Sequence, residues 1–305
     1  MSSTVFRAGA TALISGSGSG IGFSIAQLCR SYSMNLILID VHAENLAKAH
    51  LILPDTATAK TMTHAMDVSD LSSWEFLREK VTERFPEGID FLVLNAGASF
   101  KPKTGEGKKM WEDLEYFQKT FATNLRGVLN GISTFLPAIT GGSPQGHRAV
   151  VITGSKQGIT NPPGTNPAYN ASKSAVKSIA EHLAHDLRSD PATSSNVSVH
   201  LLIPGWTYTT MTGSAGPAPD PAAKPKGAWL PSQVAEYMRT KMGQGKFYIV
   251  CPDDDVGEAL DKARIAWAVG DIIEGRPALS RWDQGWKDKA SEWINNEAKR
   301  RESEQ

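Results

Sequence analysis

Short apolar runs alternate with longer amphipathic stretches along most of the chain. Short runs rich in β-branched residues predict buried strands, and apolar residues repeated at helical spacing predict helices that cover them. This alternation is typical of an α/β fold, in which helices lie on both faces of a parallel sheet. The predicted strands are 11–15, 35–39, 60–65, 91–95, 149–153, 197–203 and 247–250, and the clearest helices are 21–31, 71–85, 111–136, 171–187 and 231–242.

No linker divides this alternation, so we expect one domain, residues 1–251, built on a doubly wound seven-stranded parallel sheet. A Pro- and Ala-rich segment, 213–231, interrupts the pattern. We expect residues 206–230 to form a substrate loop. Residues 252–305 form a tail in which we expect two helices.

Composition excludes several classes of partner. Lys and Arg number 32 against 32 Asp and Glu, so the chain lacks the positive charge that nucleic-acid binding draws on. No apolar run approaches the roughly 20 residues that cross a bilayer, and Cys29 and Cys251 are too few for a disulfide framework. We therefore expect a soluble, cytoplasmic protein with no membrane partner and no metal site.

A glycine-rich turn joins the first predicted strand to the first predicted helix. Gly16, Gly20 and Gly22 follow the spacing GxxxGxG, with Ser19 and Ile21 between them. Glycines let the backbone approach a pyrophosphate, whose charge the N–H groups at the helix N-terminus meet. The turn therefore predicts a dinucleotide site. The alternative is that the glycines only let the strand and the helix pack closely.

Acidic residues end the next two strands. Asp40 is placed to accept hydrogen bonds from both adenosine ribose hydroxyls and to repel a 2′-phosphate, which favours NAD over NADP. Asp67, beside Val68, is placed to accept from the adenine amino group. The alternative is structural: Asp40 is a helix N-cap or a loop residue, and Asp67 is the N-cap of the next helix.

A tyrosine and a lysine four residues apart, Tyr169 and Lys173, would lie on one helix face. An adjacent ammonium favours phenolate and is expected to lower the pKa of Tyr169, which would let the phenol act as a general acid or base. By itself this spacing is common, and a surface pair is the alternative.

Further polar residues follow the strands that would flank this pair. Ser155 follows the fifth strand, and Asn124 lies within a predicted helix. In open α/β sheets, ligands bind beyond the carboxyl ends of the strands, where such residues gather. The other residues at these ends are Asn95, Ala96, Gly97, Pro204, Gly205 and Thr207.

Together these motifs resemble the short-chain dehydrogenase/reductase family, in its short single-domain branch with a Rossmann fold, over residues 11–250. The resemblance implies that Tyr169 exchanges a proton with the substrate oxygen and that Ser155 hydrogen-bonds that oxygen. It implies that Lys173 binds the nicotinamide ribose and depresses the pKa of Tyr169, and that Asn124 holds a water linked to Lys173.

The resemblance also implies a cofactor and a substrate class. Residues 95–97 would line the adenosine ribose, and Pro204, Gly205 and Thr207 would cover the nicotinamide amide. We expect NAD(H), with NADP(H) second, a secondary alcohol or ketone as substrate, and a homodimer or homotetramer. Phe100, Gln157, Trp206 and Trp229 are predicted to line the substrate pocket. The alternative function is a recruited, non-redox role as a cyclisation or isomerisation catalyst or a regulatory NAD(P)-binding protein.

Tryptophans concentrate in the tail, at Trp267, Trp282, Trp286 and Trp293. The spacing of Trp282, Trp286, Ala290 and Trp293 predicts that they share one helix face. Such a stripe is expected to be covered. The tail would pack on its own domain as extra core, support the substrate pocket, or form a subunit interface.

Overall fold

The computed structural model describes residues 4–103, 109–141 and 146–304. Its centre is a parallel sheet of seven strands in the order β3-β2-β1-β4-β5-β6-β7, which confirms the predicted doubly wound α/β fold. The strands are β1 (Thr11–Ser15), β2 (Asn35–Asp40), β3 (Thr61–Ala65), β4 (Phe91–Leu94), β5 (Arg148–Thr153), β6 (Val197–Ile203) and β7 (Tyr248–Val250).

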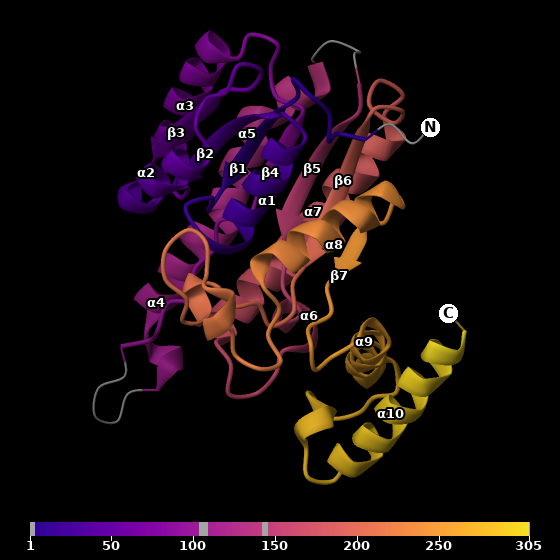
Figure 1. Ribbon diagram of the computed structural model, residues 1–305. Helices are drawn as coiled ribbons and strands as arrows, with labels where there is room; N and C mark the ends of the chain where they lie inside the picture. Colours follow the sequence, from indigo (N-terminus) through magenta and orange to yellow (C-terminus); the bar gives the residue numbers. More distant parts are fainter. Residues whose placement is uncertain (1–3, 104–108, 142–145, 305) are drawn as a thin grey trace.

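Helices cover both faces of the sheet (Figure 1). On one face lie α1 (Gly20–Ser31), α2 (Ala43–Ile52) and α8 (Pro231–Gly243); on the other lie α3 (Leu71–Arg84), α5 (Gly127–Gly141) and α7 (Pro167–Ser189). Side chains alternate between the two cores along a strand, so that Ile14 packs on the first face and Leu13 on the second. No described helix combines the length and apolar character that a bilayer crossing needs.

The helix predicted over 111–136 is interrupted. A 3₁₀ turn (Met110–Glu112) precedes α4 (Leu114–Phe121), because Asp113 caps α4 by accepting a hydrogen bond from the Tyr116 N–H at 3.1 Å. A π-helical segment (Ala122–Arg126) then joins α4 to α5. It carries Asn124, and such π segments are frequent at functional sites.

The tail forms two helices, α9 (Glu258–Ile273) and α10 (Lys287–Ser303). They bury a small core of their own, made by Ala263, Trp267, Ala290, Ile294 and Ala298. Figure 1 shows the pair in orange and yellow beyond the tip of β7, and α9 contacts the short helix α6 (Gln157–Thr160).

The prediction that Trp282, Trp286, Ala290 and Trp293 share one helix face is wrong. Trp282 ends a 3₁₀ turn (Ser280–Trp282), and Trp286 is the residue before α10. The chain turns between them because the Asp283 carboxylate accepts from the Gly285 N–H at 2.9 Å. The buried face of α10 is instead formed by Ala290, Ile294 and Ala298.

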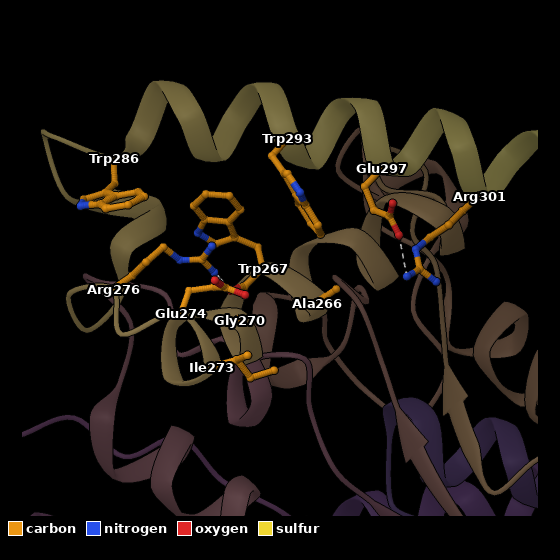
Figure 2. A pocket seen from close by; sticks show the side chains of 10 residues that line it. All are labelled: Ala266, Trp267, Gly270, Ile273, Glu274, Arg276, Trp286, Trp293, Glu297 and Arg301. Atoms are coloured by element: carbon orange, nitrogen blue, oxygen red, sulfur yellow. Dashed lines mark hydrogen bonds and ion pairs between the residues drawn. The ribbon is translucent and has the colours of Figure 1, made fainter.

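A groove of about 550 Å³ lies between α9 and α10 (Figure 2). Trp267, Trp286 and Trp293 line it, and the Arg276 guanidinium carbon lies 3.9 Å from the centroid of the Trp267 ring. Arg276 also pairs with Asp271 at 2.8 Å. The groove contains none of the predicted site residues, so it belongs to the helix pair and not to the candidate active site.

Candidate active site

The glycine turn between β1 and α1 is shaped by steric limits. Gly16 and Gly20 have φ of +65° and +56°, in the left-handed region that favours glycine. A Cβ on Gly22 would lie 2.2 Å from the Gly16 carbonyl oxygen, and one on Gly16 would lie 2.8 Å from the Ala96 Cα. Close packing thus accounts for Gly22, while the backbone conformation requires Gly16 and Gly20. The cofactor role of this turn stays a prediction.

Asp40 is the last residue of β2 and is buried beside this turn. Its Oδ2 accepts from the Gly18 N–H at 2.9 Å, and its Oδ1 accepts from the His42 N–H at 3.0 Å. The N-cap position of α2 belongs to His42, so the alternative of an N-cap at Asp40 is not observed. Two backbone donors therefore fix this carboxylate next to the predicted cofactor site.

Asp67 lies beyond β3 and does not cap α3. The N-cap is Asp70, whose carboxylate accepts from the Ser72 N–H at 3.1 Å, so the N-cap alternative for Asp67 is wrong. Asp67 instead accepts from the Ser69 N–H at 2.8 Å. Val68 is buried next to it.

Asn95 connects the ends of three neighbouring strands. Its Nδ2 donates to the Ser15 and Gly16 carbonyls at 3.2 and 3.3 Å, and its Oδ1 accepts from the Thr153 hydroxyl at 3.2 Å. The Ala96 N–H donates to the Ser15 hydroxyl at 3.1 Å. These bonds place residues 95–97 between the glycine turn and the end of β5.

Tyr169, Ser155 and Lys173 come together at the end of β5. Helix α7 begins at Pro167, earlier than the predicted 171, so Tyr169 lies in its first turn and Lys173 one turn later. The Ser155 side chain acts on the Tyr169 phenol, whose pKa it lowers. Lys173 Nζ donates to the Thr153 carbonyl at 2.7 Å and lies 5.8 Å from the centroid of the Tyr169 ring.

Burial dominates the electrostatics of this pair. It raises the pKa of Tyr169, and the hydrogen bond from Ser155 opposes the rise. Burial also lowers the pKa of Lys173 to about 8. The phenol pKa thus moves opposite to the expectation from the sequence, because burial of the phenol outweighs the effect of Ser155.

Asn124 is fully buried in the π-helical segment and lies on the same side of Gly97 as Lys173. Its Oδ1 accepts from the Ala98 N–H at 2.8 Å, and its Nδ2 donates to the Ser172 hydroxyl at 3.0 Å. A Cβ on Gly97 would lie 3.4 Å from both Asn124 Oδ1 and Lys173 Nζ, so Gly97 lies against both side chains.

Asn166 was not predicted and also shapes the site. It caps α7 by accepting from the Tyr169 N–H at 2.9 Å, and its Oδ1 accepts from the Tyr116 hydroxyl. Its Nδ2 donates to the Phe100 carbonyl at 2.6 Å. The signal was present in the sequence, because Asn followed by Pro167 is an N-cap with proline at the first helical position.

The predicted substrate residues differ in exposure. Trp206 and Phe100 are exposed, and Gln157 is partly exposed at the start of α6. Trp229 packs instead on Tyr237 of α8, with 5.7 Å between ring centroids. Thr207 and Trp229 form a β-bridge that closes the loop. The assignment of these residues to a substrate pocket stays a prediction.

The loop 206–230 contacts the glycine turn between β1 and α1. The Thr210 hydroxyl lies 3.1 Å from the Ser19 hydroxyl. A Cβ on Gly20 would lie 3.2 Å from the side chain of Thr209. Ile21 is partly buried and packs on the core of the α1 face. Pro204 and Gly205 lead from β6 into this loop, at the same edge of the sheet as Ser155.

The sequence profile of the short chain dehydrogenases matches residues 10–220, which is more than half of the chain. The chain belongs to the short-chain dehydrogenase/reductase family. Within this family, a levodione reductase from Leifsonia aquatica is 30% identical over 217 residues, covering 71% of this chain and 76% of that protein.

Two solved structures support the same membership in the short-chain dehydrogenase/reductase family. A member from Burkholderia phymatum in complex with NAD is 26% identical, with a TM-score of 0.72, covering 90% of this chain and 97% of that one. An alcohol dehydrogenase from the archaeon Thermococcus sibiricus, complexed with 5-hydroxy-NADP, is also 26% identical, with a TM-score of 0.61, covering 76% of this chain and 90% of that one. Both NAD and an NADP derivative therefore occur among similar structures.

Proposed function

We propose that this short-chain dehydrogenase/reductase interconverts a secondary alcohol and a ketone with NAD(H). The observation that carries the proposal is that Ser155 acts on the Tyr169 phenol at the end of β5, with Lys173 one turn along α7 and 5.8 Å from the Tyr169 ring. These groups lie at the same edge of the sheet as the glycine turn and Asp40. In doubly wound folds, that edge is where ligands bind.

The residues present fit a dinucleotide. Gly16, Gly20 and Gly22 would hold the pyrophosphate, and Asp40 would accept from the adenosine ribose. Lys173 would bind the nicotinamide ribose. The remaining predicted contacts are Ser19, Ile21, Asp67, Val68, Asn95, Ala96, Gly97, Tyr169, Pro204, Gly205 and Thr207. A bound nicotinamide supplies or accepts the hydride.

The protein's own groups act on the substrate oxygen. In reduction, Tyr169 donates its phenolic proton to the carbonyl oxygen, and in oxidation it takes the proton from the hydroxyl. Ser155 donates to the same oxygen and stabilises the negative charge that develops there. Burial, which raises the pKa of Tyr169, keeps the phenol protonated and suits it to proton donation. Lys173, with a pKa of about 8, is able to exchange protons near neutral pH.

The test is to follow the absorbance of reduced nicotinamide while a panel of secondary alcohols and ketones is screened. We expect turnover with at least one pair. Cofactor binding without turnover across the panel would favour the recruited, non-redox role. The complete set of Asn124, Ser155, Tyr169 and Lys173 argues against that role, because a recruited scaffold has no chemical need for all four.

Cofactor preference is predicted from Asp40. We expect a higher kcat/KM with NAD than with NADP, and we expect Asp40→Ala to narrow the ratio because the carboxylate that repels a 2′-phosphate is lost. Both efficiencies are measured for wild type and variant. Asp40→Asn removes the charge but keeps one acceptor oxygen with two lone pairs. Comparison with Asp40→Ala therefore separates the effect of the lost charge from the effect of the lost hydrogen bonds. Equal or better efficiency of the wild type with NADP would contradict the assignment.

We propose that residues 1–251 form one domain and that 252–305 are an extension that supports the substrate site or a subunit interface. Deletion of 280–305 removes α10 and the Ser280 hydroxyl that accepts from Trp267 Nε1 at 2.9 Å. We expect the deletion to raise the substrate KM or to change the oligomeric state, here proposed as dimer or tetramer, with NAD affinity little altered.

The measurements for this deletion are steady-state kinetics and light scattering after size exclusion. Deletion of residues 303–305 is the control, since it removes only residues that lie beyond Ala298, the last buried residue of α10. A protein without 280–305 that assembles and turns over as the wild type does would show that the extension is dispensable.

A further inference from the structure

Lys156 follows Ser155 directly and is paired with two carboxylates of the tail segment. Its Nζ forms ion pairs with Asp253, at 3.4 Å, and with Asp261 of α9. The side chains are 17%, 8% and 5% exposed, respectively, so the cluster is largely shielded from solvent. Surface ion pairs hold side chains weakly, but pairs this buried restrict the groups they join.

The same cluster contacts the segment that follows β6. Asp253 Oδ2 accepts from the Trp206 N–H at 3.1 Å. A Cβ on Gly205 would lie 2.6 Å from Asp253 Oδ2 and 2.7 Å from Lys156 Nζ. Since β5, β6 and β7 are neighbours in the sheet, the cluster joins the segments that leave their three carboxyl ends.

A second contact ties the substrate loop to the start of the tail. Lys224 Nζ pairs with Asp254 at 2.6 Å and donates to the Ala228 carbonyl. The Asp254 N–H donates to the Gly227 carbonyl at 3.0 Å. The residues just after β7 therefore contact both ends of the loop: Asp253 bonds Trp206 near its start, and Asp254 bonds Lys224 and Gly227 near its end.

Burial makes this arrangement costly, since it raises the pKa of Asp261 despite the attraction of Lys156. Apolar residues of similar volume would stabilise a fold as well as a buried ion pair does. The ion pair instead restricts where Lys156 can lie. The Lys156 ammonium lies against Gly205, and its fixed position restrains the backbone that carries the neighbouring Ser155.

We propose that Lys156, held by Asp253 and Asp261, is a positioning residue that makes the C-terminal helices part of the active site. It sets the place of Ser155 against Tyr169 and the place of Gly205 and Trp206 at the substrate site. The inference rests on the proposed function in one respect, the role of Ser155 and Tyr169 at the substrate oxygen.

The test compares Lys156→Met, Asp261→Asn and their double variant with the wild type. We expect each single change to lower kcat/KM by about tenfold, with NADH affinity within about threefold, and the double variant to lose little more than either single one. Lys262→Met is the matched control, because Lys262 is an exposed α9 lysine paired with Glu258 at 2.7 Å. It should leave the kinetics unchanged.

A second measurement separates positioning from simple stability. The hydrogen bond from Ser155 lowers the pKa of Tyr169, so displacement of Ser155 should shift the pH profile of kcat/KM for alcohol oxidation to higher pH in Lys156→Met. In Lys156→Arg, which keeps the positive charge, the pH profile should return towards that of the wild type. Activity losses that follow the unfolded fraction, with an unshifted profile, would overturn the proposal, as would unchanged kinetics in the single variants.

Failure of the proposed function gives a different result, since the wild type itself would not turn over. The positioning role is then tested on the ligand-free protein, where ultraviolet titration against Tyr169→Phe reports the phenol pKa. A higher phenol pKa in Lys156→Met than in wild type supports the proposal, and an equal one refutes it. If Lys156→Met does not fold, Asp261→Asn serves in the same comparison.

Discussion

Tyr169→Phe should reduce turnover by about 10²–10⁴, because general acid or base help from a positioned side chain has that value. The affinity for NAD(H) should stay within about threefold, since the phenol acts on the substrate oxygen. The measurements are single-turnover hydride transfer and NADH binding by fluorescence.

Tyr248→Phe is the control for this change. Tyr248 lies on the edge strand β7, is half exposed, and donates its hydroxyl to Glu181, away from the site. Its loss should leave hydride transfer intact. If Tyr169→Phe kept more than about a tenth of wild-type turnover, Tyr169 would not be the general acid or base.

Lys173→Met should abolish most activity and yet stabilise the ligand-free protein at pH 7. Burial lowers the pKa of Lys173 from 10.5 to about 8, which corresponds to about 3 kcal/mol of unfavourable free energy while the ammonium is charged. The variant loses the hydrogen bond from the ammonium to the Thr153 carbonyl, worth about 2 kcal/mol, so we expect a net gain of about 1 kcal/mol.

The sign with pH follows from proton binding. Between pH 8 and 10.5 the unfolded wild type binds more protons than the folded one, so wild-type stability rises with pH and the advantage of Lys173→Met shrinks. Urea unfolding at pH 7 and pH 9.5 measures the free energy of unfolding of the wild type and of Lys173→Met at each pH. Lys177→Met is the control and should show no such trend, because Lys177 lies one turn along α7 and pairs with the partly exposed Glu181. A variant less stable than the wild type at pH 7 would refute this reading of Lys173.

Local patterns in the sequence predicted the sheet and the order in which the candidate site residues follow its strands. Strands and glycine-rich turns can be predicted because each is encoded by residues close together along the chain. The structure also brings Asn124, Ser155, Tyr169 and Lys173 to one end of the sheet, as expected from the strands that they follow. The start of α7 was predicted too late because helical periodicity was followed past the cap signal at Asn166 and Pro167.

Ion pairs between residues far apart along the chain could not be predicted from the sequence. Lys156 and Asp253 are 97 residues apart, and neither has a local pattern that marks it as a partner of the other. The stripe of tail tryptophans failed for a related reason: spacing alone does not reveal the turn at Asp283 that ends the helix pattern before α10. The direction of the Tyr169 pKa depended on how deeply the phenol is buried, which only the packed structure gives.

The π-helical segment lies between two anchors that constrain the length of the chain. On one side, Tyr116 reaches the start of α7, where its hydroxyl contacts Asn166 and accepts from the Ala168 N–H at 3.4 Å. On the other side, Gly131 lies against Leu94 and Trp74, where a Cβ would meet the Leu94 side chain at 2.4 Å. Removing one residue from the α-helical turns between these anchors would rotate one of them by about 100° around the helix axis. Within the π-helical segment itself, losing one residue would leave an ordinary α-helix and keep both anchors in place. An alignment of this chain with its relatives should therefore open a gap between residues 116 and 131 only at the π-helical segment, and only of one residue.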